Sequence, residues 1–388
     1  MARILLAWEL GDGLGHVGRL LPMAAGLKAL GHECVLAVRD LVASYPLTRL
    51  ADIWVLQAPY ASVPQVAAPV YTGGYVDILA FAGFGDPLRL EALVAGWDDL
   101  LAYVQPDLIV GDFCPFLSLA TYSTAIPLIL IGDGFTLPPE RGELLPFPGL
   151  LPRNRDAELL EVVGAVQARR RRPALPRLSA LFRARDSFVV TFSELDPYAA
   201  LRVGNNLGPL QRVPEPALDE PESDWFAYLS LAHPGTDLAI DVLARHSGTG
   251  SLYLRDASET VLQRVRARGL AVHDRPQDLA TAVGAAGIVI HHGGVGTSEI
   301  ALALGRPHLL VPRHLEQRMN AHALGTLGVA VGMGRQFSAD DFRAAFHRAV
   351  ADPALPRSAR MVAAAIAARE SRSGLDRLLA ICQSRLML

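Results

Sequence analysis

The 388-residue chain contains few charged residues, almost no lysine and little cysteine. Charged side chains make up 19% of the sequence and hydrophobic ones 51%, which is the opposite of the balance in a disordered chain. The formal net charge is −3 and Lys28 is the only lysine, so no basic surface for nucleic acid or anionic lipid is expected. A chain of this length is long enough for two or three domains with large cores.

The three cysteines, Cys34, Cys114 and Cys382, are odd in number and widely spaced, and none belongs to a Cys-x-x-Cys pair. This pattern indicates neither a disulfide framework nor a zinc site, and it fits a reducing, cytosolic setting. The first ten residues lack the features of a secretion signal, and no apolar run approaches the roughly 18 residues of a membrane span. We therefore expect a cytoplasmic protein with no bound metal, no nucleic-acid partner and no membrane span.

Short apolar runs alternate with helix-like stretches along the first half of the chain. The apolar runs lie at residues 4–8, 34–38, 53–56, 108–110, 128–131 and 188–192, and the helix-like stretches at 17–30, 88–104, 116–123 and 157–171. Continuous apolar runs of this length are typical of parallel strands that are covered on both faces. The alternation predicts a doubly wound α/β sheet.

Residues 213–224 read VPEPALDEPESD, with three prolines, five acids and no periodicity, which is typical of a linker. Apolar runs then resume at 227–231, 252–254, 271–272, 288–290 and 309–311. We therefore predict two tandem Rossmann-like, doubly wound α/β domains that face each other across a cleft. The predicted boundaries are 1–212 and 225–353, followed by a helical tail at 354–388 that packs back on the N-terminal domain.

A glycine-rich turn follows the first predicted strand. Gly13, Gly15 and Gly18 match the G-x-G-x-x-G pattern, and Asp40 closes the second strand about 20 residues later. Taken alone, this pattern indicates a dinucleotide site and an NAD(P)-dependent oxidoreductase. His16 lies inside the same turn, however, where an imidazole is placed for proton transfer near neutral pH.

A second polar residue, Asp112, follows the predicted strand at 108–110. The carboxyl ends of parallel strands share one edge of the sheet, so Asp112 and His16 are able to meet there. A carboxylate on one ring nitrogen would fix the tautomer of a histidine base. The alternative is that His16 packs the first helical turn and Asp112 caps the helix at 116–123.

A second glycine-rich turn follows the strand at 288–290. It reads His291-His292-Gly293-Gly294-Val295-Gly296-Thr297, and a helix is predicted to begin at once. Glycines allow a close approach of the backbone, and the N-terminus of a helix offers unpaired N–H groups and a positive dipole end. The pattern predicts a diphosphate site.

Residues 274–317 resemble the donor-binding signature of family 1 nucleotide-sugar glycosyltransferases, which include UDP-glucuronosyltransferases and bacterial macrolide-type enzymes. The spacing from Pro276-Gln277 to His292, and on to Glu316-Gln317, fits that signature without a gap. The segment from Gly15-His16-Val17 to Leu21-Pro22 and the pair Asp112-Phe113 are similar to the N-terminal part of the family. The resemblance implies the two-domain fold called GT-B.

The resemblance also implies a role for each matching residue. His16 would be the general base and Asp112 its partner. The donor would be bound through the diphosphate, the sugar and the base, by Ser230, His233, His292, Gly294, Val295, Gly296, Thr297, Glu316, Gln317, Arg275 and Gln277.

Four positions depart from the family pattern. Asp274 stands where many members have a tryptophan, Ile300 where plant members have a ribose-binding glutamate, and Ala232-His233 where members have Gly-Ser or Gly-Thr. Gly18 replaces the asparagine that is common after His-Val. The donor therefore stays open between UDP and dTDP sugars.

Aromatic residues in the loops of the first half are expected to form the acceptor site. They include Tyr71, Tyr75, Phe81, Phe84, Phe113 and Phe135. Apolar, aromatic loops suit a hydrophobic small molecule, and ordinary loop packing is the alternative.

The resemblance implies an inverting, metal-independent transfer of a sugar to a small natural-product acceptor, without a cofactor other than the nucleotide sugar. The sequence contains no Asp-x-Asp pair that would suggest a metal-bound donor. The alternatives are an NAD(P)-dependent oxidoreductase, a sugar-nucleotide epimerase or cell-wall transferase, and a catalytically silent auxiliary protein. A homodimer is also left open.

Overall fold

The computed structural model describes residues 1–11, 13–61, 72–139, 142–147, 149–184, 186–202, 204–246, 248–334, 336–369 and 373–387. The chain forms two compact units. The N-terminal unit consists of Met1–Val190, Tyr198–Gln211 and Ser373–Leu388, and the C-terminal unit of Thr191–Pro197 and Arg212–Arg372. Each unit contains its own parallel sheet. Within the described ranges, no helix is both long and apolar enough to cross a membrane.

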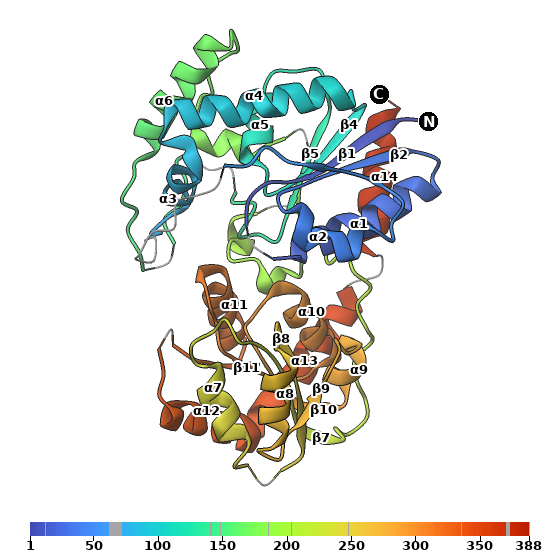
Figure 1. The fold of residues 1–388 in the computed structure, drawn as a ribbon, viewed down its shortest axis with the longest axis vertical. Helices are drawn as coiled ribbons and strands as arrows, with labels where there is room; N and C mark the ends of the chain where they lie inside the picture. Colours follow the sequence, from blue (N-terminus) through green and yellow to red (C-terminus); the bar gives the residue numbers. More distant parts are fainter. Residues whose placement is uncertain are drawn as a thin grey trace. The chain divides into compact units, whose positions relative to one another are not determined.

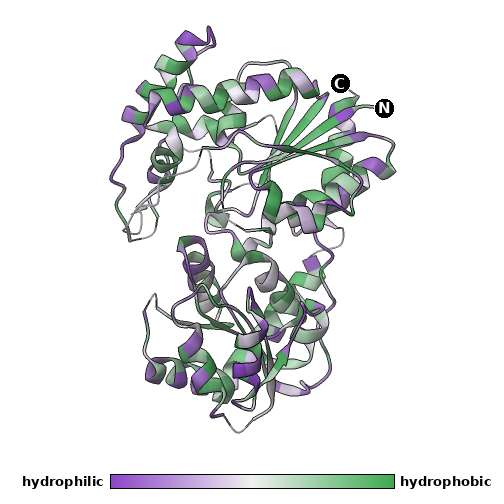
Figure 2. Ribbon diagram, viewed as in Figure 1, coloured by the Kyte–Doolittle hydropathy of each residue, from purple (hydrophilic) through white to green (hydrophobic). Residues whose placement is uncertain are grey.

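The sheet of the N-terminal unit has six parallel strands in the order β3-β2-β1-β4-β5-β6 (Figure 1). The strands are β1 (Arg3–Trp8), β2 (Glu33–Val38), β3 (Trp54–Gln57), β4 (Leu108–Asp112), β5 (Leu128–Gly132) and β6 (Asp186–Val189). Their apolar character is visible along the centre of the sheet (Figure 2). The prediction of strands at these runs is confirmed, but β6 ends at Val189 instead of Phe192, which lies in the core of the C-terminal unit.

Helices cover both faces of this sheet (Figure 1). One face carries α1 (Gly15–Ala29), α2 (Leu41–Thr48) and α14 (Gly374–Leu386). The other carries α4 (Pro87–Val104) and α5 (Pro115–Thr121), with α6 (Asp156–Arg169) and the short α3 (Tyr75–Leu79) beside them. Because both faces are covered, the central strands β1, β2, β4 and β5 are buried along almost their whole length, as continuous apolar runs require, whereas the edge strands β3 and β6 are only partly buried.

The C-terminal unit repeats the same topology with the order β12-β11-β10-β7-β8-β9. The strands are β7 (Ser223–Ser230), β8 (Gly250–Arg255), β9 (Ala271–His273), β10 (Ala286–His291), β11 (His308–Leu310) and β12 (Ala330–Gly332). The linker predicted at 213–224 is two residues too long, because β7 already begins at Ser223. Ser223 pairs with Ala286 of β10, and the amide of Asp224 donates to the carbonyl of Thr249, just before β8.

Side chains of this second sheet alternate between two layers of helices. Trp225, Ala227 and Leu229 pack on the layer that contains α7 (Thr236–Leu243), α8 (Glu259–Arg266) and α12 (Ala339–Ala351). Phe226 and Val289 pack on the layer with α9 (Leu279–Gly284) and α10 (Val295–Leu304). Next to α10 lie α11 (Leu315–Thr326) and α13 (Ala354–Arg369), which share a smaller core with it.

The helical tail is divided between the two units. Helix α13 packs within the C-terminal unit, whereas α14 packs on α1 and contributes Leu378 and Cys382 to the core of the N-terminal unit. Two glycines mark how closely α14 approaches that core. A Cβ at Gly26 would lie 2.6 Å from Leu379, and one at Gly374 would lie 2.5 Å from the carbonyl oxygen of Gly208.

The close approach at Gly374 predicts the effect of adding one methyl group. Backbone carbonyls are less able to move away than a flexible side chain, so Gly374→Ala should destabilise the protein by about 1–3 kcal/mol. Gly164 in α6 is a matched control, because a Cβ there has nothing within 4 Å. Gly164→Ala should leave stability unchanged or raise it by up to about 1 kcal/mol. Thermal unfolding measures both, and equal melting temperatures for Gly374→Ala and the unmodified protein would contradict the prediction.

Candidate functional site

Both sheets reverse their strand order at one place, which is where ligands bind in open α/β sheets. In the N-terminal unit the reversal lies between β1 and β4, and in the C-terminal unit between β7 and β10. His16 is the second residue of α1, which follows β1, and Asp112 is the last residue of β4. Asp112 is paired in register with Trp8 at the end of β1. The predicted catalytic pair therefore lies at the first reversal.

The structure brings His16 and Asp112 into contact. Nδ1 of His16 lies 3.1 Å from Oδ2 of Asp112. The carboxylate is fully buried, and the exposed fraction of His16 is 7%. The indole of Trp8 stacks on the imidazole, with ring centroids 5.2 Å apart and an interplanar angle of 16°. The ring is therefore held by a carboxylate at one nitrogen and by an aromatic face.

The opposite side of the imidazole faces the glycine-rich turn. A Cβ at Gly11 would lie only 2.7 Å from Nε2 of His16, and Gly11 has a φ of +87°. Both the backbone conformation and the space beside Nε2 thus require glycine at this position. Gly13 has a similar φ of +91° but has nothing within 4 Å of a Cβ.

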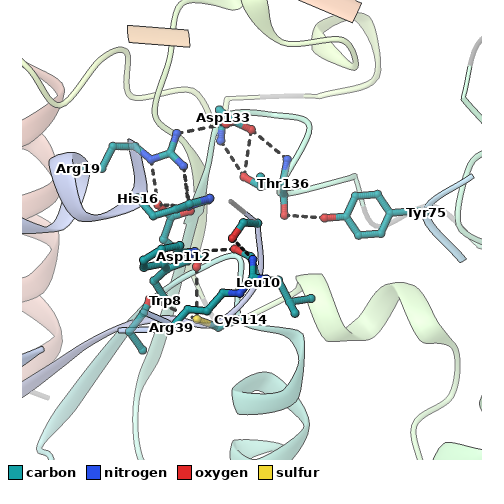
Figure 3. A network of polar contacts seen from close by, with 12 residues as sticks. Trp8, Leu10, His16, Arg19, Arg39, Tyr75, Asp112, Cys114, Asp133 and Thr136 are labelled. Atoms are coloured by element: carbon teal, nitrogen blue, oxygen red, sulfur yellow. Dashed lines mark hydrogen bonds and ion pairs between the residues drawn. The ribbon is translucent and has the colours of Figure 1, made fainter. Parts of the chain in front are cut away.

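A third charged residue of the site, Arg19, was missed by the sequence analysis. Its guanidinium binds Asp112 through two hydrogen bonds, from Nε to Oδ2 at 2.8 Å and from Nη2 to Oδ1 at 3.2 Å. Nη1 donates to Oδ2 of Asp133 at 3.2 Å, and Nη2 lies 3.0 Å from Nδ1 of His16 (Figure 3). The available signals were the helical spacing from His16 to Arg19 and the position of Asp133 directly after β5.

These contacts determine the charge of the carboxylate. Burial by itself would raise the pKa of Asp112, but the charges of Arg19 and His16 and their hydrogen bonds outweigh burial and lower that pKa to about 2. Burial would likewise lower the pKa of Arg19, but Asp112 and Asp133 together raise it. At neutral pH the site contains one guanidinium and an ionised Asp112.

Nδ1 of His16 has two neighbours that require different tautomers. If Nδ1 carries the proton, it donates to Asp112, and Nε2 then has the lone pair of a base. If Nδ1 carries the lone pair, it accepts from Nη2 of Arg19, and Nε2 is protonated. The competition between Asp112 and Arg19 therefore decides whether His16 is able to take a proton at Nε2.

Asp112 does not cap helix α5, which was the alternative role. The N-cap of α5 is Cys114, without a side-chain cap, and the first amides of the helix instead donate to Glu9. Glu9 is buried and also accepts from the indole of Trp97. Burial raises the pKa of Glu9 to about 8 in spite of these hydrogen bonds. Glu9 therefore connects the end of β1 to α4 and α5, while Asp112 is left to His16 and Arg19.

The predicted acceptor residues divide into three groups. The ring centroid of Tyr75 lies 6.1 Å from that of Phe113 and 6.1 Å from that of Phe135. The Phe113 centroid lies 6.2 Å from that of the His16 ring. Phe81 is 40% exposed, whereas Phe84 and Tyr75 are fully buried and present no surface to a ligand in this structure. Phe113 is 7% exposed and Phe135 is 8% exposed. Tyr71 lies outside the described residues.

In the C-terminal unit, helix α10 begins at Val295, within the predicted diphosphate turn at residues 291–297, and Gly294 is its N-cap. Gly293 has a φ of +84°, and its carbonyl accepts a hydrogen bond from Nδ2 of Asn320 at 2.9 Å. Gly296 is exposed and Thr297 is half-buried. A Cβ at Gly294 would have nothing within 4 Å, so the backbone at the start of the helix is open to a close approach.

His292 is held on both sides of its ring. Nε2 accepts from the amide of Ser230 at 2.8 Å, and Nδ1 donates to the carbonyl of Val311 at 2.7 Å. Burial lowers the pKa of His292 to about 4, although the hydrogen bond to Val311 opposes this shift. Neutral His292 thus joins the ends of β7, β10 and β11, and its predicted direct contact with a diphosphate stays a prediction.

His233 lies against His292, with stacked rings whose centroids are 5.5 Å apart. Its Nδ1 accepts from the amide of Gly235 at 2.9 Å, and burial lowers its pKa. Beneath the turn, Nε2 of His291 lies 2.9 Å from Nδ1 of His308, and both rings are buried. Burial lowers the pKa of both, to about 3 for His308. These histidines are uncharged parts of the scaffold.

The residues predicted to contact the sugar and the base lie on two other segments. Glu316 and Gln317 are in the first turn of α11, where Oε1 of Gln317 accepts from the amide of Arg313 at 2.8 Å. Arg275 and Gln277 are exposed between β9 and α9, and Nε2 of Gln277 donates to the carbonyl of Arg275.

Asp40 bears on the alternative of an NAD(P) site, and Asp274 bears on the glycosyltransferase pattern. Asp40 is the acid of the predicted dinucleotide pattern, and in the structure its carboxylate caps α2 by accepting from the amide of Ala43. Asp274, at the family's tryptophan position, forms an exposed ion pair with Arg266. Within the described ranges no group of three His, Cys, Asp or Glu side chains is arranged to hold a metal ion.

The low pKa of Asp112 predicts how stability depends on pH. Its pKa of about 2 in the folded chain lies below the ordinary value of 3.8, so the folded state favours the carboxylate. This contribution is fully present above pH 4 and is lost as the pH falls toward 2, which should cost about 2 kcal/mol of unfolding free energy. Urea unfolding between pH 2 and 6 should show this loss.

Two variants test that assignment. Asp112→Asn should be less stable at neutral pH, and its deficit should shrink below pH 4, because the unmodified protein loses the same interaction there. Asp376→Asn, at an exposed position of α14, should keep the full acid dependence. An Asp112→Asn deficit that stays constant from pH 6 to pH 2 would contradict the assignment.

Comparisons with known proteins agree with the fold and with part of the sequence. Residues 278–375 match the family model described as erythromycin biosynthesis protein CIII-like, C-terminal domain. The search of curated proteins gives no match. The matched segment contains α10 and α11 and therefore the predicted diphosphate turn and sugar-contacting pair.

Solved structures match along almost the whole chain. They include the calicheamicin glycosyltransferase CalG4 (18% identity, 99% of this chain and 98% of that one, TM-score 0.72) and the spinosyn rhamnosyltransferase SpnG complexed with thymidine diphosphate (16%, 97% and 100%, 0.70). A third is the glycotransferase of kitacinnamycin (19%, 99% and 99%, 0.69). At identities this low, the structural matches establish the fold alone. The solved structures confirm the predicted two-domain GT-B fold. The family-model match over residues 278–375 agrees with the resemblance predicted for the donor-binding part of the sequence.

Proposed function

We propose that this protein is an inverting glycosyltransferase that moves a sugar from a nucleoside diphosphate to a hydroxyl group of a small, apolar natural product. The observation that carries the proposal is the contact of 3.1 Å between Nδ1 of His16 and Asp112. This contact leaves Nε2 on the side of the ring that faces Gly11. A histidine oriented by a buried carboxylate is a standard arrangement for a general base.

The proposed reaction breaks one bond and forms another at the anomeric carbon. The acceptor oxygen attacks that carbon while its proton passes to Nε2 of His16. The bond from the anomeric carbon to the phosphate oxygen breaks, and the nucleoside diphosphate leaves with the electron pair. Attack from the face opposite the leaving group inverts the configuration. Asp112 stabilises the imidazolium that the proton transfer creates.

The departing diphosphate requires stabilisation of its negative charge. In the C-terminal unit, the open backbone at Gly294 and the exposed Gly296 begin α10, where amides and the helix dipole favour an anion. Thr297 adds a hydroxyl, and Ser230, His233 and His292 form the wall behind the turn. We assign charge stabilisation to these amides, so the proposed step requires no metal ion and no further cofactor.

The proposed donor is a dTDP or UDP sugar. The name of the SpnG structure records thymidine diphosphate, which supports the choice of a pyrimidine nucleotide. Glu316 and Gln317 would bind the sugar hydroxyls, and Arg275 and Gln277 would bind the base. Since Asp274 is paired with Arg266 instead of stacking as a tryptophan would, base affinity rests on Arg275 in this proposal.

The proposed acceptor is apolar because the aromatic rings of Trp8 and Phe113 lie beside the base. Phe113 lies beside His16, and Tyr75 and Phe135 lie beside Phe113 or its neighbours. Flat aromatic or macrolide-like alcohols should therefore react faster than simple sugars.

Replacement of the base tests the mechanism. His16→Ala should fold normally and bind the donor, but lose about 10²–10⁴-fold in turnover, since a positioned base typically contributes that factor. His347→Ala, at an exposed position of α12, is the control and should keep full activity. Release of the nucleoside diphosphate measures turnover. Unchanged turnover in His16→Ala would refute the assignment of the base.

Calorimetric titration tests the donor site without requiring an acceptor. dTDP or UDP should bind, and binding should be weakened by Thr297→Ala, whereas GDP and NAD⁺ should give no heat. The His16→Ala variant should bind the nucleotide as the unmodified protein does, because its substitution lies in the other unit. Binding of NAD⁺ with no binding of dTDP or UDP would favour the oxidoreductase instead.

A further inference from the structure

A second carboxylate lies behind the His16–Asp112 pair. Arg19 contacts Asp112 and Asp133 at once, with its Nη1 3.2 Å from Oδ2 of Asp133. Asp112 is fully buried, Asp133 is 4% exposed and the Arg19 side chain is 15% exposed, so water screens the charges of these three residues only weakly. Figure 3 shows the guanidinium of Arg19 joined by hydrogen bonds to the carboxylates of both Asp112 and Asp133.

We propose that Arg19 and Asp133 are positioning residues of the His16 base, in which Asp133 supplies the countercharge of Arg19 and so leaves the charge of Asp112 available to the imidazolium. The proposal rests on the proposed function, because it takes His16 as the proton acceptor. It assigns no direct contact with either substrate to Arg19 or Asp133.

The charges of the cluster support this assignment. With both acids ionised, one guanidinium and two carboxylates have a net charge of −1, and protonation of His16 brings the total to zero. Without Asp133, Arg19 and Asp112 would cancel each other, and the imidazolium would be an excess charge in a buried site. Arg19 alone would then also compete for the lone pair of Nδ1, 3.0 Å from Nη2, which favours the tautomer that is unable to act as a base.

Asp133 is itself held in a fixed orientation. Its Oδ1 accepts from both the amide and the hydroxyl of Thr136, each at 3.0 Å. The carbonyl of Thr136 in turn accepts from the hydroxyl of Tyr75 at 3.1 Å. The second oxygen of Asp133 is thereby directed to Arg19. Through Thr136, the cluster reaches the buried ring of Tyr75, which packs against Phe113 of the proposed acceptor site.

Other charged and titratable groups near His16 do not take the place of Asp133. From β4, Asp112 faces Nδ1, and the neighbouring Cys114 donates to the carbonyl of Ala7. From the segment after β2, Arg39 donates to the carbonyl of Gly11 (Figure 3). Glu9 is directed to the amides of α5. Among the described residues around His16, Asp133 is the acid that binds Arg19 in addition to Asp112.

The proposal predicts effects of opposite sign for the two variants. Asp133→Asn removes a negative charge. At a fixed pH it should lower the ratio of protonated to neutral His16 by about tenfold. Arg19→Gln removes a positive charge and should raise that ratio by a similar factor. A general loss of packing would move both variants in the same direction, so the sign distinguishes a charge effect from a structural one.

Nuclear magnetic resonance of the full chain labelled with ¹⁵N-histidine measures this directly between pH 5 and 8. The His16 signals are assigned by their absence in His16→Gln. Asp98→Asn and Arg170→Gln are matched controls, because they remove the partners of another Arg–Asp pair of the same unit, 2.7 Å apart, and should leave the His16 signals unchanged. If Arg19→Gln fails to fold, Arg19→Lys keeps the charge and should leave the protonation equilibrium within about threefold of the unmodified value.

Opposite shifts in Asp133→Asn and Arg19→Gln support the proposal, and no shift or shifts in the same direction overturn it. The corresponding activity readout is the acid limb of the kcat/KM profile, which should move to lower pH in Asp133→Asn and to higher pH in Arg19→Gln. The imidazole signals require no turnover. If they shift as expected while His16→Ala keeps full activity, the proposed function fails and the electrostatic assignment stands.

Discussion

The buried carboxylate of Asp112 is the group on which the arrangement of the N-terminal unit depends. A charge at the end of β4, with no exposed surface, is costly unless it is paired and hydrogen-bonded. Arg19 supplies two hydrogen bonds and a full positive charge, and both partners of Asp112 come from α1. The orientation of α1 on the sheet and the position of the His16 ring are therefore coupled through one carboxylate.

The C-terminal unit solves a different electrostatic problem. The diphosphate site that we propose there needs positive potential, yet the histidines around the turn are neutral, because burial lowers the pKa of His292 to about 4 and that of His308 to about 3. Their hydrogen bonds are used to join strand ends, as His292 does between Ser230 and Val311. In the function that we propose, the helix dipole at the start of α10 supplies the positive potential, which is fixed by the backbone and does not change with pH.

The two units use the same strand order, and each predicted site lies where that order reverses. In one unit the reversal presents the side chains of His16 and Asp112, and in the other it presents the backbone at the start of α10. The difference arises from the residues after the central strand. His16 and Arg19 follow β1 on a long helix, whereas Gly293 and Gly294 follow β10 and leave the backbone at the start of α10 open.

The sequence alone determined the doubly wound fold class, most strands, the contact partners His16 and Asp112, and the glycine-rich start of α10. These follow from local signals, namely apolar runs of strand length and the rule that polar residues after parallel strands share one edge. Only the tertiary structure decided that Arg19 and Asp133 join the pair, that Glu9 instead of Asp112 serves α5, and that Phe84 is buried. It also decided that both nitrogens of His292 are engaged and that α14 returns to the N-terminal unit while α13 does not. Each of these features depends on which elements pack together and on the cost of burying a charge or a polar atom. The spacing of residues along the chain determines neither the packing nor that cost.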